Sequence, residues 1–103
     1  MESDWKKFRV MAPLLRERYI REKNARILAK LSEHGKTDTE RFWDALEYME
    51  REANILHECL DGHSRSKMGL HLMLMRGAGM LRKEDLADFS EELQKQVFQD
   101  LCE

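Results

Sequence analysis

Histidine and cysteine side chains, which can ligate metals, gather between positions 57 and 63. Cys59 and His63 are four residues apart, as are His57 and Asp61, so each pair can share one face of a helix. Gly62 is typical of a helix end, and a helix that stops there separates Cys59 from His63. The sequence also has no His-x-x-x-His or Glu-x-x-His pattern. We therefore expect no bound metal, and a small-molecule or metal-binding regulator built on His57, Cys59 and His63 is the third alternative for function.

No motif in the sequence indicates catalysis. Serine, histidine and acidic residues are present, but none stands in the sequence context of a nucleophile–base arrangement. The run Gly77-Ala78-Gly79 lacks the Gly-Lys-Ser/Thr ending of a phosphate-binding loop and is typical of a helix stop instead. We expect this protein to be neither an enzyme nor the carrier of a cofactor.

Basic side chains recur along the N-terminal segment in a pattern that can follow a phosphate backbone. Arg9, Arg16, Lys23 and Lys30 are seven residues apart, so they line up along a helix. A second basic group, Arg65 and Lys67, stands at the expected start of a later helix. The predicted phosphate contacts are Arg16, Lys23, Lys30, Arg65 and Lys67. Because the net charge is −2, a solvated flank is the favoured interpretation, and nucleic-acid binding is the alternative.

The segment from 65 to 77 is apolar on nearly every side of the helix that it predicts. Such a helix must be buried, and a domain of this size rarely surrounds one completely. Methionine suits adaptable apolar contacts. We therefore predict an interface with a second subunit or a partner protein; the alternative is ordinary core. The predicted interface residues are Met68, Leu72, Met73, Met75 and Met80.

Four predicted helices within one domain, residues 1–103, position these candidate side chains. The helices are expected at 4–33, 38–61, 65–77 and 82–102, the first of them broken or kinked near Pro13. Thr37 and Glu40 form a capping-box pattern at the start of the second. Its apolar residues follow at steps of three and four, like one helix face in a bundle: Phe42, Leu46, Met49, Ala53, Leu56 and Leu60.

The charges alternate in sign along the chain. Residues 1–36 carry a net +5, residues 37–63 a net −6, residues 64–83 a net +5 and residues 84–103 a net −6. Short loops make consecutive helices antiparallel neighbours, so each basic helix lies beside an acidic one. The fold class predicted here is an all-α antiparallel four-helix bundle that forms a dimer.

Composition narrows the functional classes further. Charged residues make up 37% of the chain, above the usual quarter, which is typical of solvated helices. No run reaches the roughly 20 apolar residues of a membrane span, and the N-terminal residues lack the apolar segment of a secretory signal. We expect a cytoplasmic, non-enzymatic interaction module, a homodimer that also binds an as yet unidentified protein partner.

Overall fold

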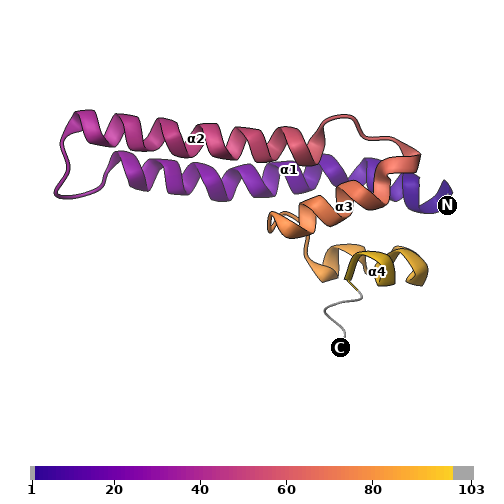
Figure 1. Cartoon of the computed structure of the whole chain (residues 1–103). Coiled ribbons are helices and arrows are strands. Elements are labelled where there is room, and N and C mark those ends of the chain that lie inside the picture. The colour runs from indigo at the N-terminus through magenta and orange to yellow at the C-terminus, as the bar shows by residue number, and fades with distance from the viewer. Residues whose placement is uncertain (1, 99–103) are drawn as a thin grey trace.

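A computed structural model describes residues 2–98 of the 103-residue chain (Figure 1). These residues form helices and turns without any strand. Two long α-helices, α1 (Glu2–Leu31) and α2 (Asp38–Leu60), run antiparallel side by side. Two shorter ones follow, α3 (Met68–Gly77) and α4 (Glu91–Phe98), each preceded by a 3-10 turn, η1 (Arg65–Lys67) and η2 (Lys83–Leu86). The prediction of an all-α fold is confirmed.

The α1–α2 hairpin turns where the sequence signals predict it. Gly35 in the connecting loop has a φ of 80°, a left-handed conformation that favours glycine. Thr37 then caps α2: its hydroxyl accepts a hydrogen bond from the Glu40 amide at 3.1 Å, and the Glu40 carboxylate accepts one from the Thr37 amide at 2.9 Å. The predicted capping box is therefore confirmed.

Pro13 does not break the first helix, and that part of the prediction is wrong. α1 continues through it as one helix of 30 residues. Pro13 is exposed, so the carbonyl that loses its partner lies on the solvent side of the helix. On the opposite side, Ala12 and Leu15 are buried and hold both halves of the helix against the core.

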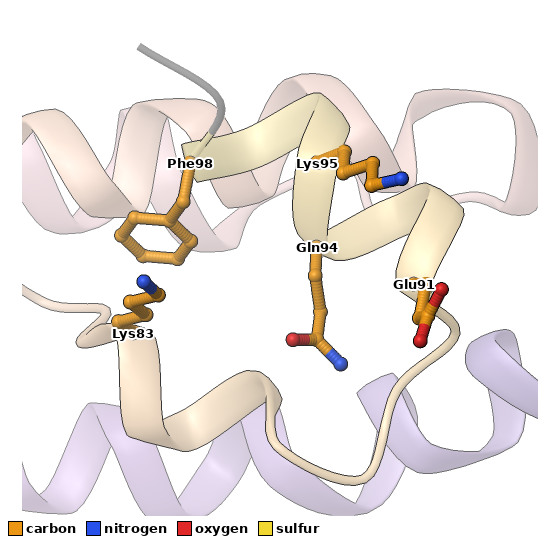
Figure 2. A pocket seen from close by; sticks show the side chains of 5 residues that line it. All are labelled: Lys83, Glu91, Gln94, Lys95 and Phe98. Atoms are coloured by element: carbon orange, nitrogen blue, oxygen red, sulfur yellow. The ribbon is translucent and has the colours of Figure 1, made fainter. Parts of the chain in front are cut away.

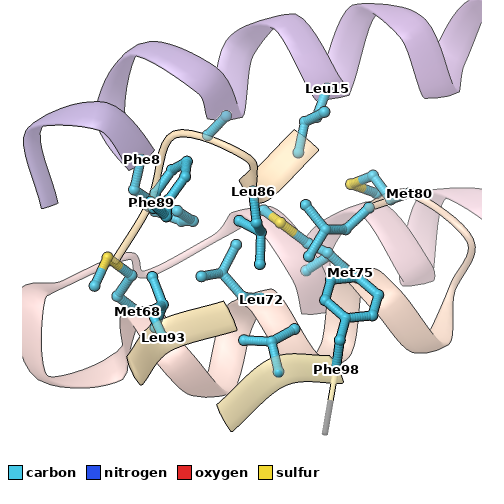
Figure 3. Close-up of a cluster of buried hydrophobic side chains, with 14 of the residues drawn as sticks. Phe8, Leu15, Met68, Leu72, Met75, Met80, Leu86, Phe89, Leu93 and Phe98 are labelled. Carbon is cyan, nitrogen blue, oxygen red and sulfur yellow. The ribbon is translucent and has the colours of Figure 1, made fainter. Parts of the chain in front are cut away.

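The second half of the chain forms a cap over one end of the hairpin, the end where the N-terminus lies (Figure 1). The core forms between this cap and the hairpin, and Figure 3 shows its side chains meeting from α1, α3, α4 and the segment that joins them. Leu72, Met75, Leu86 and Val97 are completely buried there. Phe8, Leu15 and Tyr19 supply the α1 side of this core, and Cys59 supplies the α2 side.

Several polar contacts fasten the cap, and three of them involve buried or partly buried side chains of α1 and α3. Buried Asp4 accepts hydrogen bonds from the amide (2.9 Å) and the hydroxyl (2.6 Å) of Ser90. Arg18 donates two bonds to the Asp85 carboxylate, at 2.9 and 2.7 Å. Both ring nitrogens of buried His71 lie within 3.1 Å of backbone carbonyl oxygens in the segment that joins α2 to α3. The cap is thus tied to the hairpin by charge-assisted bonds as well as by apolar packing.

Helices α3 and α4 are shorter than the predicted third and fourth helices. As a result, the four α-helices do not run side by side along the full length of the hairpin. Residues 83–86 form a 3-10 turn, and α4 begins only at Glu91. Leu101 and Cys102, which the prediction placed in the fourth helix, lie outside the described residues. With a rise of about 1.5 Å per residue, α3 (10 residues) spans about 15 Å and α2 (23 residues) about 34 Å. The hairpin therefore extends beyond the cap as a two-helix arm (Figure 1).

Candidate interaction surface

The arm of the hairpin has almost no core of its own. Among the described residues, Ala45 is the one buried side chain between positions 20 and 58. Yet this stretch holds most of the apolar seam that the sequence predicts for the second helix. We define the open face by the apolar side chains that follow both helices along one side of the arm: Ile20, Ile27 and Leu31 of α1, and Phe42, Leu46, Met49 and Ala53 of α2.

A shallow apolar groove runs across this open face near the hairpin tip. Its volume is about 250 Å³, and both helices contribute to its lining: Ile27, Leu31, Phe42, Ala45, Leu46 and Met49. Phe42 is 57% exposed, Met49 48% and Leu31 46%. Two further exposed side chains, Leu28 on α1 and Trp43 on α2, extend the apolar surface to its two outer edges. The Trp43 ring meets the Phe42 ring edge to face, with 5.1 Å between centroids.

Helix geometry turns the open face away from the cap. A residue advances by roughly 100° around an α-helix. On α2, Phe42, Met49 and Ala53 share one stripe that lies roughly 100° around the helix from the core residue Cys59. On α1, the open-face residues lie roughly 120° around from the core residues Phe8, Leu15 and Tyr19. Because the cap packs on the core stripes, α3 and α4 leave the open face uncovered.

The two helices of the hairpin carry opposite charge. α1 has nine basic and four acidic residues, a net +5, and α2 has two basic and seven acidic residues, a net −5. Part of this charge is used between them: Lys30 lies over the Tyr48 ring at 5.2 Å, and Lys36 in the loop pairs with Asp44 at 2.6 Å. Hydrogen bonds from Lys36 lower the pKa of Asp44. The open face is therefore an apolar strip with a basic helix on one side and an acidic helix on the other.

The methionine-rich helix is placed differently from its prediction. Met68, Leu72, Met75 and Met80 are buried in the core of the chain itself, which leaves them unavailable to a second subunit in this structure. Met73 alone of the five predicted interface residues is exposed, and its exposed neighbour on α3 is Leu70. The chain surrounds α3 more completely than the small size of the domain suggested, because η2, α4 and their connections fold back over α3.

The structure does not bring the predicted phosphate contacts together. Lys23 and Lys30 are partly buried over tyrosine rings in the hairpin, at 4.7 and 5.2 Å. Arg16 lies on α1, 3.9 Å from a neighbouring glutamate. At the cap, Arg65 donates two hydrogen bonds to the Glu2 carboxylate, at 2.9 and 3.0 Å, and Lys67 is exposed. Arg16, Lys23 and Lys30 thus follow one stripe of α1, whereas Arg65 and Lys67 lie at the cap.

The residues of the third alternative do not converge on a common point. The Cys59 thiol is buried, and burial raises its pKa. His57 is exposed, with its Nδ1 2.8 Å from the Asp61 carboxylate. His63 binds the backbone carbonyl of Cys59 through Nε2 at 2.9 Å. Within residues 2–98, no group of three or more potential ligands could hold a metal ion.

A second hollow lies beside α4 (Figure 2), with a volume of about 210 Å³. Polar and charged side chains surround the Phe98 ring there: Lys83, Glu91, Gln94 and Lys95. These groups have mixed charge and share no catalytic pattern. The hollow borders the end of the described residues, whereas the open face lies wholly within them.

No protein family model, curated protein or solved structure matches this chain. In the described part of the chain, no helix combines the length and apolar character that crossing a membrane requires. The candidate function therefore depends on the surface itself. Sequence reasoning identified the α2 seam and expected its apolar residues to join the third helix in an interface; it did not predict which part of the seam would be exposed.

Proposed function

We propose that this protein is a non-enzymatic helical interaction module that self-associates through the open face. The observation that carries this proposal is the exposure of the α2 seam. Its spacing is that of a bundle core, but in the arm only α1 packs beside it. Exposed apolar side chains that are contiguous and flanked by charge are typical of protein–protein surfaces.

The open face alone is smaller than a standard interface, so the rest of the hairpin must contribute to a stable dimer. Residues 42–53 of α2 span about 18 Å and two helices are about 20 Å wide, so the open face presents roughly 360 Å². Standard protein interfaces bury about 800 Å² on each partner. Burial of the exposed halves of Phe42, Met49 and Leu31 contributes about 1 kcal/mol each, and twofold symmetry doubles every such contribution.

The proposal is tested by light scattering on a sizing column, with wild type and three double variants. Phe42→Glu with Met49→Glu places two charges on the open face. Two matched pairs place the same charges on other exposed apolar positions: Val10→Glu with Leu14→Glu on α1, and Leu70→Glu with Met73→Glu on α3. All six positions are exposed, so circular dichroism should show unchanged helix content in every variant.

We expect wild type to elute near twice the chain mass of 12.3 kDa, and the open-face variant alone to become a monomer. A wild-type monomer at tens of micromolar would overturn self-association. A monomer produced only by the α3 pair would move the interface to the helix that the sequence first indicated.

Nucleic-acid binding has less support than self-association. Three of its predicted contacts follow one stripe of α1 and two lie at the cap, and the Lys23 and Lys30 ammonium groups lie over tyrosine rings of the hairpin. Binding through these charges would show a strong dependence on salt. A gel shift at low salt that persists in Arg16→Gln with Lys67→Gln would indicate another basic surface.

A further inference from the structure

We infer that the occupant of the open face is a second copy of this chain whose hairpin points in the same direction, related by a twofold axis along the arm. Each α1 then packs against the partner's α2, and the two arms complete a four-helix bundle between subunits. This inference rests on the proposed function, because it names the partner and its orientation at the same surface.

Charge separates this arrangement from its antiparallel counterpart. A twofold axis along the arm exchanges the two sides of the open face, so the +5 helix of one subunit meets the −5 helix of the other. An axis across the arm would instead set α1 against α1 and α2 against α2. Like charges across an interface cost free energy, so they disfavour the wrong pairing even where single ion pairs stabilise little.

The outer edges of the arm favour the same arrangement. Leu28 on α1 and Trp43 on α2 are exposed, and both lie within about three turns of the hairpin tip. In the parallel arrangement, the Leu28 edge of one subunit lies beside the partner's Trp43 edge at the same height. Fully overlapped antiparallel hairpins would set these apolar edges near the body end of α1, where Arg9 and Arg16 line a hollow with Leu60.

The cap does not obstruct this pairing. The core stripes that carry α3 and α4 lie roughly 100–120° around each helix from the open face. Both caps therefore sit on the outer sides of the paired hairpins. They can share one end of the dimer without meeting each other.

The orientation is tested with spin labels at three heights along one exposed stripe of α2. Thr39→Cys, Glu50→Cys and His57→Cys are each made in a chain that also carries Cys102→Ser; Cys59 is buried and has a raised pKa, so its thiol reacts slowly. The outer two labels are about 27 Å apart along the helix. Pulsed electron resonance then measures the distance between the two labels of each dimer.

In the parallel dimer the three distances are similar, because every label faces its copy at the same height. In an antiparallel dimer the axial offsets of the three labels differ by at least roughly 20 Å, whatever the position of the axis. A light-scattering dimer with such unequal distances would overturn the orientation and leave self-association intact. A monomer would instead overturn the proposed function itself, so the two failures are distinguishable.

The charge pairing has its own test in a mixing experiment. Exchanging sign on the α1 edge beside the open face, with Arg21→Glu, should weaken the homodimer at least tenfold. Adding a second chain with Glu50→Lys, at the corresponding edge of α2, should restore association, because the altered α1 edge then faces a basic α2 edge. Association that stays equally weak in the mixture would contradict the pairing of α1 with the partner's α2.

Discussion

Replacing Asp4 should release the cap from the hairpin. Asp4 is 3% exposed and accepts both the amide and the hydroxyl hydrogen of Ser90, the residue that precedes α4. A hydrogen bond to a charged group is worth about 1.5–3 kcal/mol, and an unpaired buried donor adds a penalty. We expect Asp4→Ala to lower the free energy of unfolding by about 2–3 kcal/mol. With a slope near 1–2 kcal/mol per molar urea, the unfolding midpoint should fall by roughly 1–3 M.

The same contact sets a pH dependence. Burial raises the pKa of Asp4, but the hydrogen bonds from Ser90 outweigh burial and hold that pKa below its usual value. A carboxylate with a lowered pKa in the folded state contributes stability above its unfolded pKa of about 3.9, and this contribution is lost as the pH falls through the folded value. Wild type should therefore lose more stability than Asp4→Asn between pH 5 and pH 2.

Urea unfolding followed by circular dichroism measures both effects. Ser3→Ala is the matched control, because its side chain is exposed one position away. An Asp4→Ala midpoint within error of this control would refute the reasoning, since it would mean that other contacts place α4. Equal acid sensitivity of wild type and Asp4→Asn would separately refute the pH argument. The acid sensitivity that Asp4→Asn retains belongs to other groups such as Asp85, whose pKa is lowered by its hydrogen bonds from Arg18.

Two further substitutions test how the chain holds its helices. Pro13→Ala should restore the hydrogen bond that the Arg9 carbonyl lacks and stabilise the protein by about 1–3 kcal/mol. This gain should appear as a raised thermal unfolding midpoint. An unchanged or lowered midpoint would show that proline is favoured at this site. His71→Leu should destabilise by about 1–3 kcal/mol, because the ring N–H of this buried side chain can donate to a carbonyl oxygen, that of Asp61 or Lys67, and the substitution removes that donor. Urea unfolding measures this loss, and equal stability would show that water replaces the imidazole.

Local sequence signals predicted the turn between α1 and α2 well. Gly35 and the capping box of Thr37 and Glu40 act within a few residues, so nothing distant in the chain can override them. Pro13 was misjudged for the opposite reason. Its cost of a few kcal/mol is local, but the buried residues on either side, Ala12 and Leu15, gain from a continuous helix.

The fate of apolar side chains was harder to predict, because periodicity shows which residues share a face but not what covers that face. Met75 and Phe42 both belong to apolar stripes in the sequence. Met75 is completely buried, since η2 and α4 fold over α3, whereas Phe42 is more than half exposed, since nothing in the described chain reaches the arm. The difference depends on contacts between distant segments, and these are absent from any local pattern.

The length of the helices connects the seam, the charges and the proposed assembly. A bundle seam and alternating charge specify four helices side by side, whether one chain or two supplies them. α3 and α4, with 10 and 8 residues, reach about 15 and 12 Å, so they cover less than half of the 34 Å of α2. Over the remaining length no other helix of residues 2–98 covers the seam, and the proposed assembly completes the pattern with helices from outside the chain. A second hairpin of opposite charge order supplies two helices of the right length, and this is why we favour a copy of the chain over a single partner helix.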